Sequence, residues 1–220
     1  DMTGTLDVFT GSLSAGDAVT VKTGSAQTMV VGDGAASATV SVAANKLLQA
    51  AGANNNDLIL RGTTAFVVTA LNADLMAATT SGDIDVTTVD DADADTLDLR
   101  TGSGDFTLTG VDSQDTMVVD ADDLTSGATL VLDGSSTMTI DNVASGVTVD
   151  ANGDGAGAAL SGVLTVDLDA SATSVSVLSG VAATTVNTIT GGDVSVNATA
   201  LADDTLLTLT GAADATVTGL

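Results

Sequence analysis

Short runs in which every second residue is apolar recur along the chain, separated by polar turns. Residues 96–99, 106–109, 129–132 and 137–140 read TLDL, FTLT, TLVL and TMTI. Alternation with period two, built from Thr, Val, Ile and Leu, is the pattern of a half-buried β-strand. Gly, Asp, Asn and Ser between the runs favour turns, and Pro, which interrupts strand pairing, is absent. The pattern therefore predicts an all-β protein with fewer than about one residue in ten in helices.

Two alanine-rich stretches, residues 43–51 and 70–78, are the only segments with a helical signal. Alanine has the highest helix propensity of the residues. Each stretch is therefore expected to form about one or two helical turns.

The sequence contains long internal repeats. Residues 118–143 align with residues 195–220 without a gap, so that Leu132 falls on Leu209 and Gly134 on Gly211. A third copy ends at Leu71 and carries five additional residues in a polar stretch. An insertion confined to polar residues indicates a lengthened surface loop.

The repeats predict three units, at residues 3–80, 81–160 and 161–220, of which the last is truncated. We expect the chain to be a segment of a larger protein, with the units either separate or joined in one continuous solenoid. Equivalent residues should occupy equivalent places. Leu132 and Leu209 should both be buried, and Gly134 and Gly211 should lie at matching turns.

Two architectures fit this pattern. In a repetitive parallel β-solenoid, turns of roughly 20 to 30 residues would stack into about 7 to 11 rungs, a rod on the order of 35–50 Å long. In the alternative, each unit is a small Ig-like β-sandwich, and three of them lie in tandem. Short uniform strands and the scarcity of aromatic residues, 1% of the chain, favour the solenoid.

The composition excludes several classes of function. The chain has no His or Cys, so the Ser-His-Asp triad, thiol nucleophiles and ordinary zinc sites are absent. The net charge of −25 repels nucleic acid. No apolar run approaches the 18 or so residues of a membrane helix. We therefore expect no enzyme activity, no nucleic-acid partner and no membrane insertion, and the absence of Cys is typical of exported bacterial surface proteins.

Two acidic segments are candidate calcium sites. Asp150, Asn152 and Asp154 match the start of an EF-hand-like loop, in which alternate oxygen-bearing side chains converge on the ion. The bidentate Glu of such loops is missing, and a polar turn between strands is the alternative.

The densest acidic cluster comprises Asp90, Asp91, Asp93 and Asp95. Its carboxylates repel one another unless a cation or solvent screens them. The alternatives are calcium ligation and a solvated loop.

Whole stretches of the chain resemble bacterial surface-layer proteins and giant repeat adhesins secreted by the type I route. The resemblance is one of composition and repeat cadence, seen in residues 129–143 (TLVLDGSSTMTIDNV), 161–180 and 205–220 (TLLTLTGAADATVTGL). It implies an extracellular structural protein at the bacterial cell surface, commonly a β-solenoid and often calcium-dependent. The glycine-rich nonapeptide of calcium β-rolls is absent as a tandem run, so calcium sites would be of another kind.

The expected function is that of a structural repeat segment of a surface layer, filament or adhesin stalk, with calcium as its cofactor. Its expected partners are further copies of itself or flanking repeats of the same protein. The alternative is an adhesin module that recognises a cell-surface glycan or protein.

Overall fold

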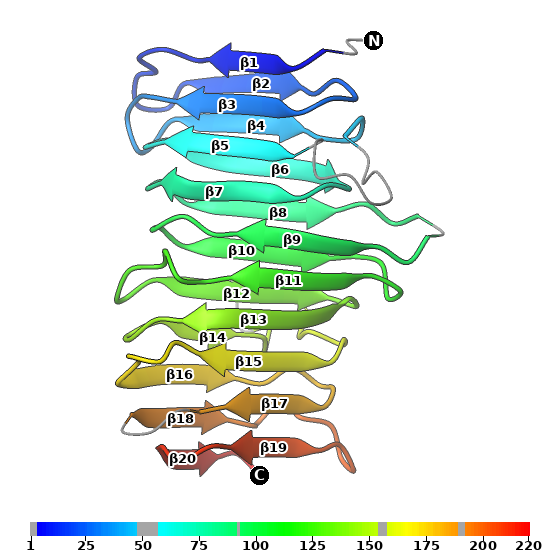
Figure 1. The fold of residues 1–220 in the computed structure, drawn as a ribbon, viewed down its shortest axis with the longest axis vertical. Helices are drawn as coiled ribbons and strands as arrows, with labels where there is room; N and C mark the ends of the chain where they lie inside the picture. Colours follow the sequence, from blue (N-terminus) through cyan, green and yellow to red (C-terminus); the bar gives the residue numbers. More distant parts are fainter. Residues whose placement is uncertain (1–3, 48–56, 92, 154–157, 189–191) are drawn as a thin grey trace.

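The computed structural model describes residues 4–47, 57–91, 93–153, 158–188 and 192–220, and all regular structure in them is β-strand. Twenty strands alternate between two sheets of ten, and each strand pairs with the next but one along the chain. In Figure 1 the strands are stacked along one axis, with the odd-numbered sheet in front of the even-numbered sheet.

The strands are short in both sheets. The odd-numbered sheet contains β1 (Leu6–Phe9), β3 (Thr28–Gly32), β5 (Leu58–Gly62), β7 (Leu75–Thr80), β9 (Thr96–Arg100), β11 (Thr116–Asp120), β13 (Thr137–Val143), β15 (Leu164–Leu168), β17 (Thr184–Asn187) and β19 (Leu207–Thr210). The even-numbered sheet contains β2 (Ala18–Lys22), β4 (Thr39–Ala43), β6 (Ala65–Leu71), β8 (Ile84–Thr88), β10 (Phe106–Gly110), β12 (Thr129–Gly134), β14 (Thr148–Asp150), β16 (Ser174–Leu178), β18 (Asp193–Asn197) and β20 (Asp214–Thr218).

Neighbouring strands within each sheet pair in parallel, which is the pairing of a β-solenoid. The turns of the solenoid differ in length. Thr28 pairs with Leu58 one turn later, and Leu58 pairs with Leu75 after the next turn, which is much shorter. The chain makes about 9 turns, and a spacing of about 4.8 Å gives a stack roughly 43 Å long. The predicted solenoid is confirmed. The alternative of tandem Ig-like sandwiches, which need antiparallel sheets, is wrong.

Inward-facing side chains form columns that run from turn to turn through the core. One column passes through all ten strands of the even-numbered sheet: Val19, Val40, Phe66, Ile84, Phe106, Leu130, Val149, Val177, Val196 and Val217. From Val40 to Val196 its members are at most 2% exposed. Two sheets about 10 Å apart leave room for one layer of side chains from each, and this explains why Val, Leu and Ala dominate the core.

The sequence repeat corresponds to seven strands. Residues 3–80 contain β1 to β7, residues 81–160 contain β8 to β14, and residues 161–220 contain β15 to β20. One continuous core runs through all three units. Because seven is odd and the strands alternate between sheets, each unit starts on the sheet opposite to its predecessor.

Backbone conformations recur at the repeat-equivalent positions. Gly134 and Gly211 have φ of +97° and +101°, and Gly62 in the first unit has φ of +110°. A Cβ on Gly134 would lie 2.1 Å from the carbonyl oxygen of Gly110, so no other residue fits there. The prediction that Gly134 and Gly211 lie at matching turns is confirmed.

The prediction for the two leucines needs correction. Leu132 is 1% exposed, whereas Leu209 packs against the core but is only half-buried. Leu132 belongs to β12 and Leu209 to β19, so the two lie in opposite sheets. Leu209 is less buried because, in the described part of the chain, β19 is covered on one side only.

The expectation of helical turns is wrong for residues 70–78, which form the end of β6, the connection at residues 72–74 and the first part of β7. Residues 43–47 form the end of β4 and a turn, and residues 48–51 lie outside the described residues. Hydrogen bonds to the turns on either side outweigh the helix propensity of alanine in a short segment.

Ala70 occupies a conformation that disfavours alanine. Its φ is +54°, next to the register shift between Val68 and Leu71, and the equivalent positions hold Asn142 (φ +60°) and Gly219 (φ +78°). A left-handed backbone costs an alanine about 1–2 kcal/mol in the folded protein. Glycine avoids this cost, but its greater conformational freedom stabilises the unfolded chain and offsets part of the gain. Ala70→Gly should therefore raise the free energy of unfolding by about 0.5–1 kcal/mol, measured by urea denaturation.

Ala77→Gly is the matched control. Ala77 is buried in β7, and its backbone is not left-handed. Glycine in a strand interior lowers stability by about 0.5–1 kcal/mol. A decrease in stability for Ala70→Gly as well would contradict the account of this bulge.

Candidate cation-binding surfaces

The predicted cluster of Asp90, Asp91, Asp93 and Asp95 lies in the turn between β8 and β9. Asn72 Nδ2 donates a hydrogen bond of 2.7 Å to Asp91 Oδ2, and the backbone N–H of Asp93 donates one of 3.1 Å to Asp91 Oδ1. Asp90 and Asp93 are exposed, and Asp95 is half-buried. The turn thus holds Asp91 in place and leaves the carboxylates of Asp90 and Asp93 more open to solvent.

The next turn of the solenoid adds two acids that the sequence analysis missed, Asp112 and Asp115. Both are 4% exposed. Asp115 Oδ1 accepts a 3.0 Å hydrogen bond from the backbone N–H of Asp95, and Asp112 Oδ1 accepts one of 2.8 Å from that of Gln114. Asp112 Oδ2 is buried and has no hydrogen-bond partner.

Burial raises the pKa of both Asp95 and Asp115, and neighbouring carboxylates, Asp91 and Asp112 among them, raise it further. Asp90 and Asp112 follow paired strands at corresponding places. A search for Asp residues one turn apart would therefore have found this extension once the turn length was known.

Asp150 is the last residue of β14, and its Oδ1 accepts a 3.1 Å hydrogen bond from the backbone N–H of Asn152. This is the local geometry of an Asx turn. Asp154, the third residue of the predicted calcium loop, lies outside the described residues. The described part of the loop therefore has the conformation of a polar turn.

A third acidic group runs down the outer face of the odd-numbered sheet. Asp120 pairs directly with Asp141 of the next turn, and Asp167 follows after a register shift. Asn142 Nδ2 donates a 3.1 Å hydrogen bond to Asp120 Oδ1, and Asn187 Nδ2 donates one to Asp167. Burial raises the pKa of Asp141, and so do the charge of Asp167 and a hydrogen bond with it.

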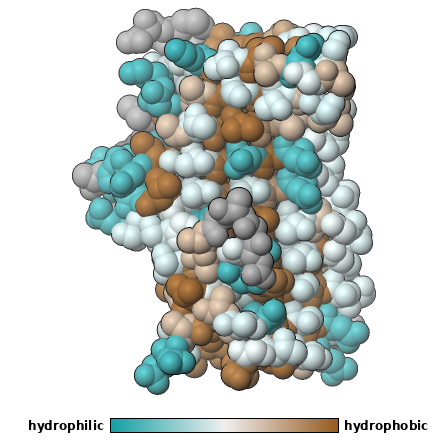
Figure 2. All heavy atoms as spheres, turned by 180° about the vertical axis from the view of Figure 1, so that it is seen from behind, coloured by the Kyte–Doolittle hydropathy of each residue, from teal (hydrophilic) through white to brown (hydrophobic). Residues whose placement is uncertain are grey.

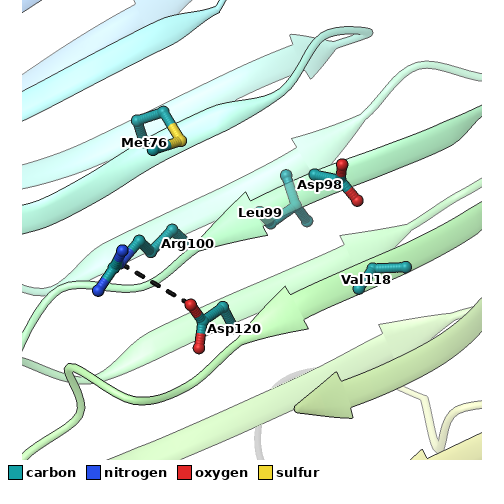
Figure 3. Close-up of a pocket in the computed structure, with 6 residues that line it drawn as sticks. All are labelled: Met76, Asp98, Leu99, Arg100, Val118 and Asp120. Carbon is teal, nitrogen blue, oxygen red and sulfur yellow. Dashed lines mark ion pairs between the residues drawn. The ribbon is translucent and has the colours of Figure 1, made fainter. Parts of the chain in front are cut away.

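Arg100 places a positive charge at the Asp120 end of this column. Its Nε lies 2.7 Å from Asp123 Oδ2 and 3.9 Å from Asp120 Oδ2. Beside it, Met76 and Val118 line a shallow hollow of about 230 Å³ on the outer face, where the side chains of Arg100 and Asp120 point toward each other (Figure 3). Met76 is 42% exposed, so the hollow combines one cation, carboxylates and an apolar floor.

Among the described residues, no three or more His, Cys, Asp or Glu side chains converge closely enough to hold a metal ion. The same part of the chain contains no helix long and apolar enough to cross a membrane. The acidic groups are therefore clusters of charge whose side chains would have to move to coordinate an ion.

Comparison with known proteins yields no relative: no family model, no curated protein and no solved structure matches this chain.

The raised pKa values predict that mild acid stabilises the protein. A carboxyl whose pKa is higher in the folded than in the unfolded chain favours folding as it takes up a proton, so stability rises as the pH falls toward the ordinary value of 3.8. Asp57, Asp95, Asp115, Asp133 and Asp141 all shift in this direction. Calorimetry should show Tm rising as the pH is lowered from 7 toward about 4.

Asp141→Asn tests, at one residue, whether the charge of a half-buried carboxylate causes this pH dependence. Removing this charge should stabilise the protein at pH 7 by about 0.2–1 kcal/mol, the range of cross-strand pairs. It should also reduce the rise in Tm that acid produces. Asp169→Asn is the control, because hydrogen bonds from Ser171 lower the pKa of Asp169 and its charge favours folding. That variant should lose stability at pH 7. A loss for Asp141→Asn at pH 7 would refute the account.

Proposed function

We propose that the chain is an extracellular structural repeat segment of a bacterial cell-surface protein, in a surface layer, filament or adhesin stalk, and that calcium stabilises it. The observation that carries the proposal is the unbroken core of a parallel solenoid, which extends through every unit of the repeat. Parallel turns joined by main-chain hydrogen bonds make a stiff element whose length grows with the number of repeats. Such an element suits a spacer or lattice component, and the proposal assigns it no enzyme activity.

The charge of the chain supports an exported role. A net charge of −25 keeps a rod with large flat faces soluble and resists association until cations or specific contacts engage it. The absence of Cys removes the risk of unwanted disulfides outside the cell. In this proposal the partners are further copies of the chain or flanking repeats of the same protein.

The second candidate function is that of an adhesin module that binds a cell-surface glycan or protein. The hollow beside Met76 and Arg100 favours it, because an apolar floor with a few polar groups is the usual composition of a binding site. Its shallow form on a flat sheet face favours the structural role over this one.

We propose calcium as the ion because the Asp carboxylates of the chain offer many oxygen ligands. The turn that holds Asp95 and the neighbouring turn that holds Asp112 and Asp115 supply several carboxylates within reach of one another's charge. The buried Oδ2 of Asp112, which lacks a partner, is one oxygen that an ion would satisfy. Calcium accepts six to eight oxygens in flexible geometry, whereas magnesium demands a tight octahedron.

Thermal melting in calcium and in chelator tests this proposal. An ion that binds only the folded chain adds about 2.7 kcal/mol at a hundredfold excess over its Kd. We therefore expect Tm to rise by several degrees in millimolar calcium, with a smaller rise in magnesium.

Asp112→Asn, Asp93→Ala and Asp154→Ala should each reduce the rise in Tm. Asp7→Ala, on the exposed side of β1, should leave the rise unchanged. Identical melting curves in calcium and in chelator would remove calcium from the proposal and leave the acidic charge as a means of solubility.

A further inference from the structure

The outer face of the odd-numbered sheet changes in character along the rod. One outward column on this face holds apolar residues and then a cation on β3 to β9, namely Met29, Ile59, Met76 and Arg100. Farther along the rod, on β11 to β17, the same column holds Asp120, Asp141, Asp167 and Asn187. The face therefore has an apolar and cationic half, on β3 to β9, and an acidic half, on β11 to β17.

The apolar and cationic half is open to solvent. Met76 is 42% exposed and lines two shallow hollows, of about 230 and 280 Å³. Arg61 is exposed next to the second hollow, and it has no ion pair, because the ion pairs of the described residues all involve Arg100. An apolar strip rimmed by charged residues has the composition of an interaction surface.

The opposite face of the rod lacks this division into halves. Figure 2 looks onto the even-numbered sheet, where hydrophilic, intermediate and hydrophobic residues are interspersed along the rod. Both Arg residues of the chain, Arg61 and Arg100, lie on the odd-numbered sheet, in β5 and β9. The odd-numbered sheet is therefore the face on which a strongly acidic partner would find positive charge.

We propose that this face binds the same face of a second copy of the chain, with the two rods side by side and antiparallel. The pair has a twofold axis that runs along the strand direction, between β9 and β11. Because β9 and β11 are neighbours in the sheet, Arg100 of each copy then faces Asp120 of the other. The apolar and cationic half of each rod lies against the acidic half of the other.

The same axis brings β5 of one copy over β15 of the other. Leu58 and Val166 belong to one inward column of the sheet. Arg61 and Asp169 each lie three residues beyond these two, so Arg61 of each copy faces Asp169 of the other. The cation without an ion pair thereby gains a carboxylate, and every contact occurs twice.

The distribution of charge decides between antiparallel and parallel rods. In a parallel pair the acidic half would lie against itself, with Asp141 of one copy facing Asp141 of the other. In the antiparallel pair Asp141 lies opposite Met76, and Asp74 lies opposite Thr139. Like charges placed directly opposite each other destabilise a contact, so the antiparallel arrangement is the favourable one.

The size of the face suits a reversible dimer. Strands β3 to β17 take part, and a spacing of about 4.8 Å with five residues of about 3.3 Å each gives a patch of roughly 34 by 17 Å. This patch is on the order of 600 Å² per copy, which is the lower end of the range for specific interfaces. The strands of the two sheets are aligned, as in face-to-face packing of sheets.

This inference rests on the proposed structural role, whose partner and contact face it specifies, but its test is made in chelator and without a cell surface. Failure of the calcium experiment would leave the lateral pairing in place. Failure of the pairing would leave a rod stabilised by calcium.

Charge reversal at one contact tests the pairing. Analytical ultracentrifugation of the whole chain should show a monomer–dimer equilibrium. Arg61→Asp and Asp169→Arg each place two pairs of like charges in the dimer, so each variant alone should raise the dissociation constant at least about tenfold. An equimolar mixture of the two should restore the dimer, because the substitutions exchange the charges of the contact. Lys22→Asp and Asp193→Arg are the matched controls on the even-numbered sheet, and each should change the constant by less than about threefold.

A single spin label tests the orientation of the rods. With Asp7→Cys as the only Cys of the chain, an antiparallel pair places the two labels nine strand spacings apart, roughly 43 Å, whereas a parallel pair places them roughly 10 Å apart. Circular dichroism and Tm show whether each variant folds. Should Asp169→Arg not fold, Arg61→Asp and the label distance still decide.

Three results would overturn the proposal. The first is a chain that stays monomeric at all concentrations, and the second is a short distance between the labels. The third is a folded Arg61→Asp variant that dimerises as well as the unaltered chain, or a mixture of two folded variants that stays monomeric.

Discussion

The main-chain hydrogen bonding between successive turns is the interaction on which the rest of this structure depends. Each strand lies parallel to the strand one turn earlier, and the register brings like residue over like residue, as in the column from Val40 through Phe66 and Ile84 to Phe106. A polar group placed inward would disturb the turns on both sides. The alternation of apolar and polar residues therefore has to persist through every turn, and in the thin interior small and medium aliphatic side chains predominate, with Phe66 and Phe106 as the buried aromatic residues.

The same stacking creates the main electrostatic problem of the molecule. Acids on one outer column lie about one strand spacing apart, as Asp120 and Asp141 do, and the chain has only four Lys and Arg residues to compensate 29 acids. Arg100 forms ion pairs at one end of that column. Farther along it, Asn142 and Asn187 donate hydrogen bonds to Asp120 and Asp167. Protons, and calcium in our proposal, relieve the remaining repulsion. Stability should accordingly respond to the ionic surroundings more than is usual for a β-protein.

The sequence was sufficient to predict the fold class, because strand alternation and repetition are local and periodic signals. It could not show that the unit contains an odd number of strands, which requires counting them, and so it did not place Leu132 and Leu209 in opposite sheets. The acidic clusters were predicted only in part. Asp91 and Asp95 are close in sequence and were found, whereas Asp112 and Asp115 join them across one turn. Because successive turns differ widely in length, no fixed period reveals that proximity.

Distances along the outer face of the odd-numbered sheet test the central claim of a continuous stack most directly. The chain has no Cys, so pairs of cysteines can carry spin labels without background. With one label at Thr208, moving the other from Val118 to Asp7 should lengthen the measured distance from roughly 19 Å to roughly 43 Å, since the labels are then four and nine strand spacings apart. Distances that do not grow in proportion to the number of turns would contradict the solenoid.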